Sequence, residues 1–335
     1  MKEQDARLKG AFSGSHVLVT GGAGFIGSTL AIRLAETGAS VTVVDSLIPE
    51  YGGNLQNLAG YEDRIRINIS DVRDDHGFQH LIRGKDFLFN LAGQTSHVDS
   101  MKDPFTDLEI NCRSQLTILE ACRKHNRDVR VVFASTRQIY GRPRHLPVDE
   151  DHLVQPVDVN GINKAAGERY HVLYNNVYGI RACSLRLTNT YGPRMRVKDA
   201  RQTFLGIWIK KILSGEQFQV FGDGLQVRDF NYVDDVVDAM LEGALRSEGF
   251  GNVFNLGSEE RITLRDLADL LVECNGGGSY EIVPFPGERK AIDIGDYYGD
   301  FGRFQRSHDW HPRVALREGL TKSLDYYRRT GDKYF

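Results

Sequence analysis

The chain has 335 residues, of which 41% are hydrophobic and 26% charged, and its formal net charge is -3. These values are typical of a globular protein with a large core, and they exclude the strongly basic balance of many nucleic-acid-binding proteins. No apolar run approaches a membrane span and the start of the chain lacks a signal-peptide core, so we expect a cytoplasmic protein without membrane contact. The four cysteines lack the spacing of metal ligands, so no metal site is predicted.

The first strong signal is a glycine-rich turn that follows the apolar run at residues 17–20. Gly22, Gly24 and Gly27 have the G-x-G-x-x-G spacing, in which glycines permit a tight turn, close approach of a pyrophosphate and packing of a helix on a strand. The helix expected at residues 28–37 would direct its free amide groups and its positive dipole end toward phosphates. The pattern therefore predicts a dinucleotide site.

The end of the next apolar run indicates which dinucleotide binds. Residues 40–44 are expected to form a second strand, and Asp45 follows directly. A carboxylate at this position can accept hydrogen bonds from the adenosine ribose hydroxyls, and it repels the additional phosphate of NADP. The sequence therefore predicts NAD as the cofactor, rather than an ordinary βαβ unit with an incidental acid.

Strands and helices alternate through the first half of the chain. Apolar runs at residues 64–69, 86–93 and 129–134 are expected strands, and residues 104–125 carry apolar side chains at helical spacing. This alternation is typical of an α/β fold with a doubly wound, Rossmann-type parallel sheet. We predict that residues 1–180 form a NAD-binding Rossmann domain.

The pattern becomes less regular in the rest of the chain. A strand is expected at residues 180–187, helices are expected at 203–213, 233–245 and 264–273, and the remaining tail is polar and rich in aromatic residues. Residues 181–335 are predicted to form mainly a smaller, C-terminal lobe that binds substrate. Because no disordered linker separates the two parts, this lobe is expected to interleave with the first domain.

Several motifs together resemble the extended short-chain dehydrogenase/reductase family, in particular its NAD-dependent nucleotide-sugar epimerases, dehydratases and decarboxylases. The similarity covers nearly the whole chain, and the motifs are specific for the family but much less so for the reaction. They are the glycine turn at 20–27, Asp71-Val72, the run 90–93, Ser135-Thr136 with Tyr140-Gly141, Arg186 with 189–193, and 222–224 through 228–235.

The resemblance implies which residues surround the reacting sugar carbon and which hold NAD. In such enzymes a Ser or Thr hydroxyl and a Tyr-x-x-x-Lys pair flank the carbon that NAD oxidises, and Thr136 and Lys164 match two of these positions. Thr136 would hydrogen-bond the reacting hydroxyl, and Lys164 would bind the nicotinamide ribose and supply positive charge. The residues expected to contact NAD are Gly21, Gly24, Phe25, Ile26, Gly27, Asp45, Asp71, Val72, Leu91, Ala92, Gly93, Asn111 and Lys164.

The third position departs from the family pattern, because Asn160 stands four residues before Lys164, where tyrosine is usual. A phenol whose pKa is lowered by an ammonium group can take the proton of a sugar hydroxyl, whereas a carboxamide has no accessible proton equilibrium. Asn160 can therefore orient that hydroxyl but cannot act as its base. Three explanations are open: another group transfers the proton, the redox step has been lost, or the residue was changed on purpose.

If the chemistry survives, another side chain near the nicotinamide must transfer the proton. The matched loops offer Thr136, Tyr140, Lys164 and His97, and His97 is the most interesting because a histidine pKa suits proton transfer at neutral pH. Its loop follows a strand and approaches the sugar in relatives. The alternative is that His97 only hydrogen-bonds its own loop or caps the following turn.

Two further departures bear on the reaction. Related dehydratases have Asp-Glu directly after the catalytic Thr, where this chain has Arg137 and Gln138, so the general acid for loss of water is missing. The favoured function is therefore a NAD-dependent nucleotide-sugar epimerase that acts through transient oxidation of the sugar ring. The alternatives are a dehydratase or decarboxylase, and a non-catalytic protein that binds NAD and a nucleotide sugar.

The resemblance also points to residues that hold the nucleotide diphosphate: Asn189, Arg228 and Arg289. A planar guanidinium suits this task because it can contact two oxygens at once. Arg137 is a further candidate for substrate binding, toward a carboxylate or a phosphate. In relatives, helices that correspond to residues 104–125 and 158–177 form a four-helix contact between subunits, so a homodimer is expected.

Overall fold

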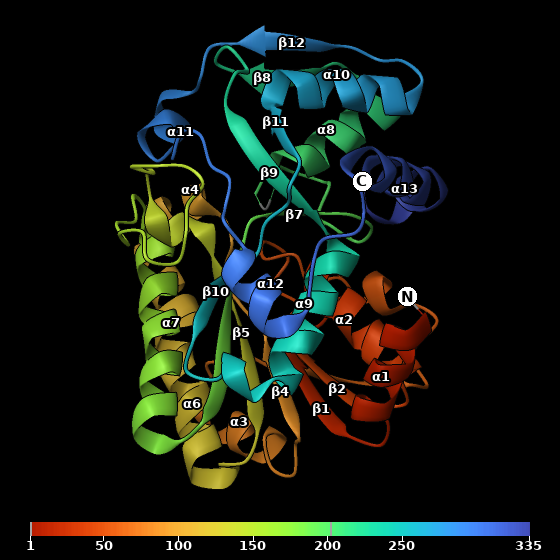
Figure 1. Ribbon diagram of the computed structural model, residues 1–335. Helices are drawn as coiled ribbons and strands as arrows, with labels where there is room; N and C mark the ends of the chain where they lie inside the picture. The colour runs from red at the N-terminus through yellow and green to blue at the C-terminus, as the bar shows by residue number, and fades with distance from the viewer. Residues whose placement is uncertain (1, 202) are drawn as a thin grey trace.

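A seven-stranded parallel sheet forms the larger part of the structure, a computed structural model that describes residues 2–201 and 203–335 (Figure 1). Its strand order, β3-β2-β1-β4-β5-β6-β10, contains the 3-2-1-4-5-6 order of the doubly wound dinucleotide-binding fold. The predicted α/β fold with a Rossmann-type sheet is therefore confirmed. The strands are β1 (His16–Thr20), β2 (Ser40–Asp45), β3 (Ile65–Ile69), β4 (Phe87–Asn90), β5 (Arg130–Thr136), β6 (Arg181–Leu187) and β10 (Val253–Asn255).

Helices cover both faces of this sheet, which explains why its central strands are almost continuously apolar. In β1, Val17 pairs with Val41 on one side and with Phe87 on the other. One face packs against α1, α2, α9 and α12, and the other packs against α3, α6 and α7. These helices are α1 (Lys2–Phe12), α2 (Phe25–Glu36), α3 (Asp75–Leu81), α6 (Ser114–His125), α7 (Val159–Tyr178), α9 (Val233–Leu245) and α12 (Gly302–His308).

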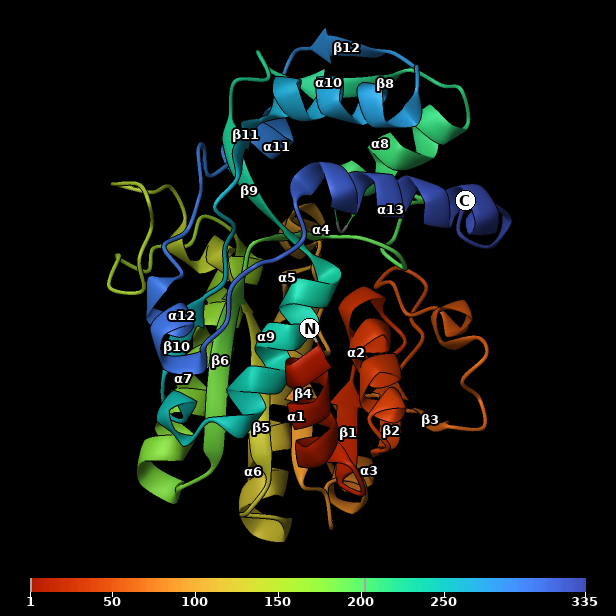
Figure 2. The same cartoon turned by 45° about the vertical axis from the view of Figure 1, so that its right-hand side comes forward.

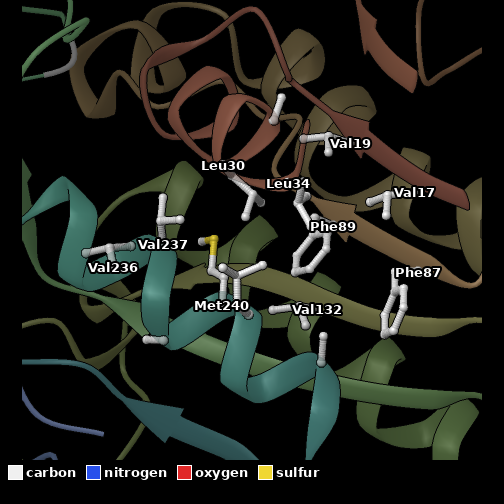
Figure 3. Packing of buried hydrophobic residues seen from close by; sticks show 14 of the residues in the cluster. Val17, Val19, Leu30, Leu34, Phe87, Phe89, Val132, Val236, Val237 and Met240 are labelled. Carbon is white, nitrogen blue, oxygen red and sulfur yellow. The ribbon is translucent and has the colours of Figure 1, made fainter. Parts of the chain in front are cut away.

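Helices α2 and α9 lie side by side on one face of the sheet, although they are far apart in the chain (Figure 3). Leu30 and Leu34 of α2 and Met240 of α9 belong to one buried cluster with the β1 and β4 residues Val19 and Phe89. The polar start of the chain contributes to this core as well, because α1 buries Leu8 and Phe12 completely. The sequence pattern did not predict α1.

The helix expected at residues 104–125 is continuous but irregular. It consists of α5 (Pro104–Leu108), a π-helical turn η2 (Glu109–Arg113) and α6. Pro104 stands in the first turn, where its missing amide hydrogen does not disturb the helix, and the side chain of Asp103 caps the helix by accepting from Thr106 N. Another short helix, α4 (His97–Lys102), precedes it and is capped by Ser96.

The second lobe contains two small sheets, of order β11-β9-β7 and β12-β8, with helices packed around them (Figures 1 and 2). Trp208, Phe218, Leu267 and Leu320 are members of its separate buried cluster. The elements are β7 (Asn189–Tyr191), α8 (Phe204–Leu213), β8 (Phe218–Phe221), β9 (Val227–Tyr232), β11 (Arg261–Thr263), α10 (Leu264–Asn275), β12 (Tyr280–Val283), α11 (Gly287–Ala291) and α13 (Leu316–Thr330).

Short 3-10 segments complete the fold, and they are η1 (Leu55–Leu58), η3 (Arg137–Tyr140), η4 (Ser247–Gly249) and η5 (Gly331–Lys333). The large sheet takes β6 and β10 from beyond residue 180, and α9 packs on it. The division into domains at residue 180 stays a prediction. Within the described ranges, no helix has the length and apolar character needed to cross a membrane.

Candidate active site

A cavity of about 890 Å³ lies at the carboxyl ends of the large-sheet strands and reaches residues of the second lobe. Ligands of open α/β sheets bind at this edge. Among the predicted site residues, Asn111 does not line the cavity; it is buried and donates from Nδ2 to Gln94 O at 2.9 Å and to Asp107 Oδ2 at 3.0 Å. The predicted site residues that line the cavity are Gly21, Gly24, Phe25, Ile26, Gly27, Asp45, Asp71, Val72, Leu91, Ala92, Gly93, His97, Thr136, Arg137, Asn160, Lys164, Asn189, Arg228 and Arg289.

The glycine turn has the shape that a pyrophosphate requires. Gly21 has a positive φ of 66°, and a Cβ at this position would lie 2.9 Å from Ala92 N. A Cβ at Gly27 would overlap the Gly21 carbonyl oxygen. Helix α2 begins after Gly24 without a side-chain cap, so the amide groups of its first turn are available to an anion at the cavity wall. These residues fit the dinucleotide that the turn predicts.

Two carboxylates stand beside this turn at the ends of β2 and β3. Asp45 is fixed by two backbone amides, since Oδ2 accepts from Ala23 N at 3.0 Å and Oδ1 from Leu47 N at 2.9 Å, while burial raises its pKa. Asp71 pairs with Arg73, whose hydrogen bonds lower the pKa of the Asp71 carboxyl. Each carboxylate oxygen can accept a further bond, so Asp45 can still accept from ribose hydroxyls.

Thr136 and Lys164 approach the cavity from β5 and α7. Thr136 ends β5, and its Oγ1 accepts from Gln138 N at 3.2 Å. Lys164 is buried, its Nζ donates to Ala134 O at 3.1 Å, and Nζ lies 5.1 Å from the centroid of the Phe133 ring. Burial lowers the pKa of Lys164 to about 8, because the charged ammonium loses its hydration.

Asn160 lies one helical turn before Lys164 and is also buried. Its Nδ2 donates to Gln94 O at 2.8 Å and to Asp107 Oδ2 at 3.1 Å. The NH₂ group is therefore engaged with protein acceptors, and it could orient a sugar hydroxyl only by giving up these bonds. Oδ1 is the part of the carboxamide that remains suited to a ligand.

The acceptor Asp107 was not anticipated from the sequence. It is fully buried, and its carboxylate accepts from Asn111 at 3.0 Å, Asn160 at 3.1 Å and Asn163 at 2.8 Å. Three amide donors compensate a carboxylate that is removed from water, and its negative charge partly supports the ammonium of Lys164. A signal existed, because Asp107 lies four residues before Asn111 on the same helical face.

A second unanticipated acid supports His97. Nδ1 of His97 lies 3.1 Å from Oδ2 of the buried Asp158, which also accepts from Gln138 Nε2 at 2.7 Å and caps α7 through Gly161 N at 2.6 Å. Burial would raise the pKa of Asp158, but the His97 ring and these hydrogen bonds hold it below its usual range. The contact is close but lacks hydrogen-bond geometry, so the carboxylate acts on the ring by its charge, and Nε2 is the second ring nitrogen.

Tyr140, the other candidate of the matched loops, is a structural residue. It is fully buried, accepts from Arg186 Nη1 at 2.6 Å and donates to Asn255 Oδ1 at 2.7 Å. Burial raises the pKa of its phenol to about 12. Arg186 in turn forms a buried ion pair with Glu168. These three side chains stabilise the end of β5 and do not line the cavity.

Arginines from both lobes reach the cavity. Arg137 donates from Nη2 to Asn189 Oδ1 at 3.0 Å, and Arg289 lies 5.6 Å from the centroid of the Phe221 ring. Arg228, on β9, donates to Gly295 O and lies 3.5 Å from Asp293. The pKa of Arg228 is lowered to about 10, mainly by burial and to a smaller extent by the positive charge of Arg137. This end of the cavity is suited to anionic groups.

The fold and the cavity together define a nucleotide-binding α/β protein of the dehydrogenase type, with a dinucleotide turn in one lobe and arginines suited to anions in the other. The chain belongs to the NAD dependent epimerase/dehydratase family, whose model matches residues 17–257. NAD is accordingly its cofactor.

Individual relatives are similar over almost their whole length. A UDP-glucose 4-epimerase of Mycolicibacterium smegmatis is 32% identical, over 93% of this chain and 98% of the relative. The structure of the Thermotoga maritima UDP-glucose 4-epimerase with UDP-glucose superposes with a TM-score of 0.85 at 32% identity, covering 94% of this chain and 99% of that one. The structure of the dTDP-glucose 4,6-dehydratase of Streptomyces venezuelae with NAD bound superposes with a TM-score of 0.85 at 26% identity, covering 95% of this chain and 98% of that one. The comparisons thus include relatives that catalyse different reactions.

Proposed function

We propose that the chain is a nucleotide-sugar epimerase that acts through transient oxidation of the sugar ring. Bound NAD would supply the acceptor for the hydride of the ring carbon and the donor for its return. Thr136 hydrogen-bonds the reacting hydroxyl, and Lys164 binds the nicotinamide ribose and keeps positive charge near it. The diphosphate is held by Asn189, Arg228 and Arg289. The similarity to UDP-glucose 4-epimerases supports this proposal.

The observation that favours epimerisation over loss of water is the occupation of the two positions after Thr136. Arg137 cannot act as a general acid at neutral pH, because a guanidinium does not release its proton. Gln138 is buried and donates to Asp158, and a carboxamide has no proton to give. Neither side chain supplies the acid that dehydration requires, whereas epimerisation by oxidation and return of the same hydride needs no such acid.

We assign the proton transfer to His97, with Asp158 as its positioning residue. His97 lines the cavity and its Nδ1 faces the Asp158 carboxylate at 3.1 Å, so Nε2 is the nitrogen that accepts the proton of the sugar hydroxyl. The nearby carboxylate stabilises the imidazolium that forms. The imidazolium returns the proton to the sugar oxygen when the sugar ring is reduced. Asn160 holds the loop that carries His97 through its bond to Gln94 O.

One observation favours a second function, a protein that binds NAD and a nucleotide sugar without catalysis. The side chain in the usual position of the base is a carboxamide whose NH₂ group is engaged with Gln94 and Asp107. Such a site could retain both binding pockets after losing turnover.

The test is to incubate the purified protein with NAD and a panel of UDP- and dTDP-sugars in heavy water, and to follow the products by mass spectrometry and NMR. An isomer without a mass change supports epimerisation with a retained hydride. Deuterium at carbon, or loss of water or carbon dioxide, would show deprotonation, dehydration or decarboxylation instead. Binding of one sugar without any product would make the non-catalytic function the better explanation.

The assignment of the base has its own variants. His97→Gln is expected to lower kcat by about 100-fold or more, in the range typical of general acid-base catalysis, with little change in KM. Asp158→Asn is expected to lower kcat less and to alter its pH profile, because it removes the carboxylate whose charge acts on the ring. His76→Gln makes the same change at an exposed histidine outside the cavity and serves as the control. Full activity of His97→Gln would place the base elsewhere.

The proposed assembly is a homodimer formed through the surface of α5 and α7. Phe105 of α5 is 76% exposed, and Ile162, Leu173 and Val177 are exposed at helical spacing along α7, which packs beside α5. Ile162→Glu is expected to shift the protein from dimer to monomer in sedimentation experiments. A wild-type protein that is monomeric at all concentrations would exclude the dimer.

A further inference from the structure

Arg137 lines the cavity with part of its guanidinium unpaired. It follows Thr136 directly, its Nη2 donates to Asn189 Oδ1 at 3.0 Å, and its guanidinium carbon lies 5.0 Å from the centroid of the Tyr297 ring. Nη1 is shielded from solvent and has no hydrogen-bond partner. In the described part of the chain no carboxylate forms a salt bridge with Arg137. The side chain is therefore held on two sides, with one donor group unused.

The carboxylates that raise the pKa of Arg137, Asp229 and Asp293, are in contact with other groups. Asp229 is fully buried and accepts from Thr188 Oγ1 and from Gly299 N, and Asp293 lies beside Arg228. The pKa of Arg137 is lowered by burial, yet a guanidinium stays protonated in proteins. The Arg137 side chain is half-buried and its charge has no carboxylate in a salt bridge with it among the described residues, so this wall of the cavity is suited to an anionic ligand.

The position of Arg137 in the chain indicates which part of a ligand it meets. Arg228 and Arg289 already provide positive charge for a diphosphate, and both come from the second lobe. Arg137 instead neighbours Thr136, the residue assigned to the reacting sugar hydroxyl, and the next side chain, Gln138, is turned to Asp158. Its guanidinium also bonds Asn189, and its charge lowers the pKa of Arg228, both of which are assigned to the diphosphate. Arg137 therefore neighbours both parts of the ligand, and the variants below distinguish them.

We propose that Arg137 binds a carboxylate on the sugar, so that the substrate is a nucleotide-activated sugar acid. This inference rests on the proposed function, because that function assigns the sugar to the neighbourhood of Thr136. The hydrogens of Nη1 have no acceptor among the described residues, and because Nη1 is shielded, they reach a carboxylate only when the guanidinium turns toward the cavity. Asn189 and Tyr297 hold the group in place beforehand, which reduces the entropy lost on binding.

The test compares ligands that differ only at C6 of the sugar. Calorimetry on the NAD-loaded protein would measure the dissociation constants of UDP-glucuronic acid against UDP-glucose, of UDP-galacturonic acid against UDP-galactose, and of UDP alone. In at least one pair the acid is expected to bind about tenfold more tightly or better, as for a charge-assisted hydrogen-bonded pair. Taking the ratio within a pair cancels the contribution of the nucleotide.

Two matched variants distinguish the sugar from the diphosphate. Arg137→Gln is expected to abolish the preference for the acid while leaving the affinity for UDP within about twofold. Arg289→Gln makes the same change at a residue assigned to the diphosphate, and it is expected to weaken all ligands, UDP included. Circular dichroism and thermal unfolding would show whether each variant is folded.

Two results would overturn the inference. The first is a wild-type protein that binds neither acid more tightly than its neutral partner, a result that needs no variant. The second is an Arg137→Gln variant that loses affinity for UDP as much as for the acids, because Arg137 would then serve a phosphate. Binding is measured without turnover, so a protein that selects acids but has no activity refutes only the proposed function. An epimerase restricted to neutral sugars refutes only this inference.

Discussion

Replacement of Lys164 by methionine should make the protein more stable while removing its activity. A pKa lowered from 10.5 to about 8 means that burial disfavours the ammonium by about 3 kcal/mol relative to water, at about 1.4 kcal/mol per pKa unit. Methionine has a similar length and no charge to desolvate. Loss of the hydrogen bond to Ala134 O offsets about 1 kcal/mol of this gain, so Lys164→Met is expected to unfold with a free energy about 1–2 kcal/mol higher than wild type.

The effect should depend on pH in a defined direction. Because the pKa of Lys164 is lower in the folded state than in the unfolded chain, the unfolded chain binds more protons between about pH 8 and 10.5. The stability of the wild type therefore rises through this window relative to the variant. The advantage of Lys164→Met should be complete below pH 8 and should disappear as the pH approaches 10.5.

Urea unfolding of the NAD-free wild type and variant at pH 7 and pH 9.5 measures this difference, since all other titrating groups are shared. NAD titration and the epimerase assay, run in parallel, should show weaker NAD binding and loss of turnover in Lys164→Met. A variant that is less stable than wild type at pH 7, or a difference that does not shrink at pH 9.5, would refute the reasoning. Unchanged turnover and unchanged NAD affinity would remove Lys164 from the site.

Three other changes test separate parts of the structure. Gly27→Ala places a Cβ against a backbone carbonyl of the glycine turn, so NAD affinity measured by calorimetry should fall by about tenfold or more. Glu168→Gln leaves the buried guanidinium of Arg186 without its carboxylate and should lower the unfolding free energy in urea by about 3–5 kcal/mol. The same change at the partly exposed Glu109, which pairs with the exposed Arg113, should alter it by less than about 1 kcal/mol. Asp45→Ser removes the charge that disfavours NADP, so the ratio of NADP to NAD dissociation constants should move toward one.

The main strands of the large sheet could be predicted because buried parallel strands are short, almost continuous apolar runs. Helix α9 was predicted at its observed bounds. Two helices at the ends of the chain were missed for different reasons. Helix α1 has few apolar residues among many charged ones, and only packing against the sheet shows that Leu8 and Phe12 are buried. Helix α13 did carry a signal, because its leucines recur every four residues, but the surrounding polar and aromatic residues obscured it.

The candidate site was predictable where a local motif defines it. The glycine turn and Asp45 follow from spacing, the Thr136 and Lys164 positions follow from the resemblance to the family, and all of them line one cavity. The spacing of Asp107 and Asn111 was a signal for one local contact, but the bonds of Asp107 to α7 and the contact of Asp158 with His97 join segments that are distant in the chain and were not predictable. A motif shows which side chains face a ligand, whereas the groups that hold those side chains depend on the tertiary fold.

The insertion of β10 beside β6 has a consequence for synthesis of the chain on the ribosome. Strand β6 has its free edge exposed until residues 253–255 have left the exit tunnel, by which point much of the second lobe has already emerged. An unpaired strand edge is a template for pairing with another chain. Nascent chains that stop before residue 253 should therefore self-associate, whereas chains that extend past α12 can close the edge and cover it.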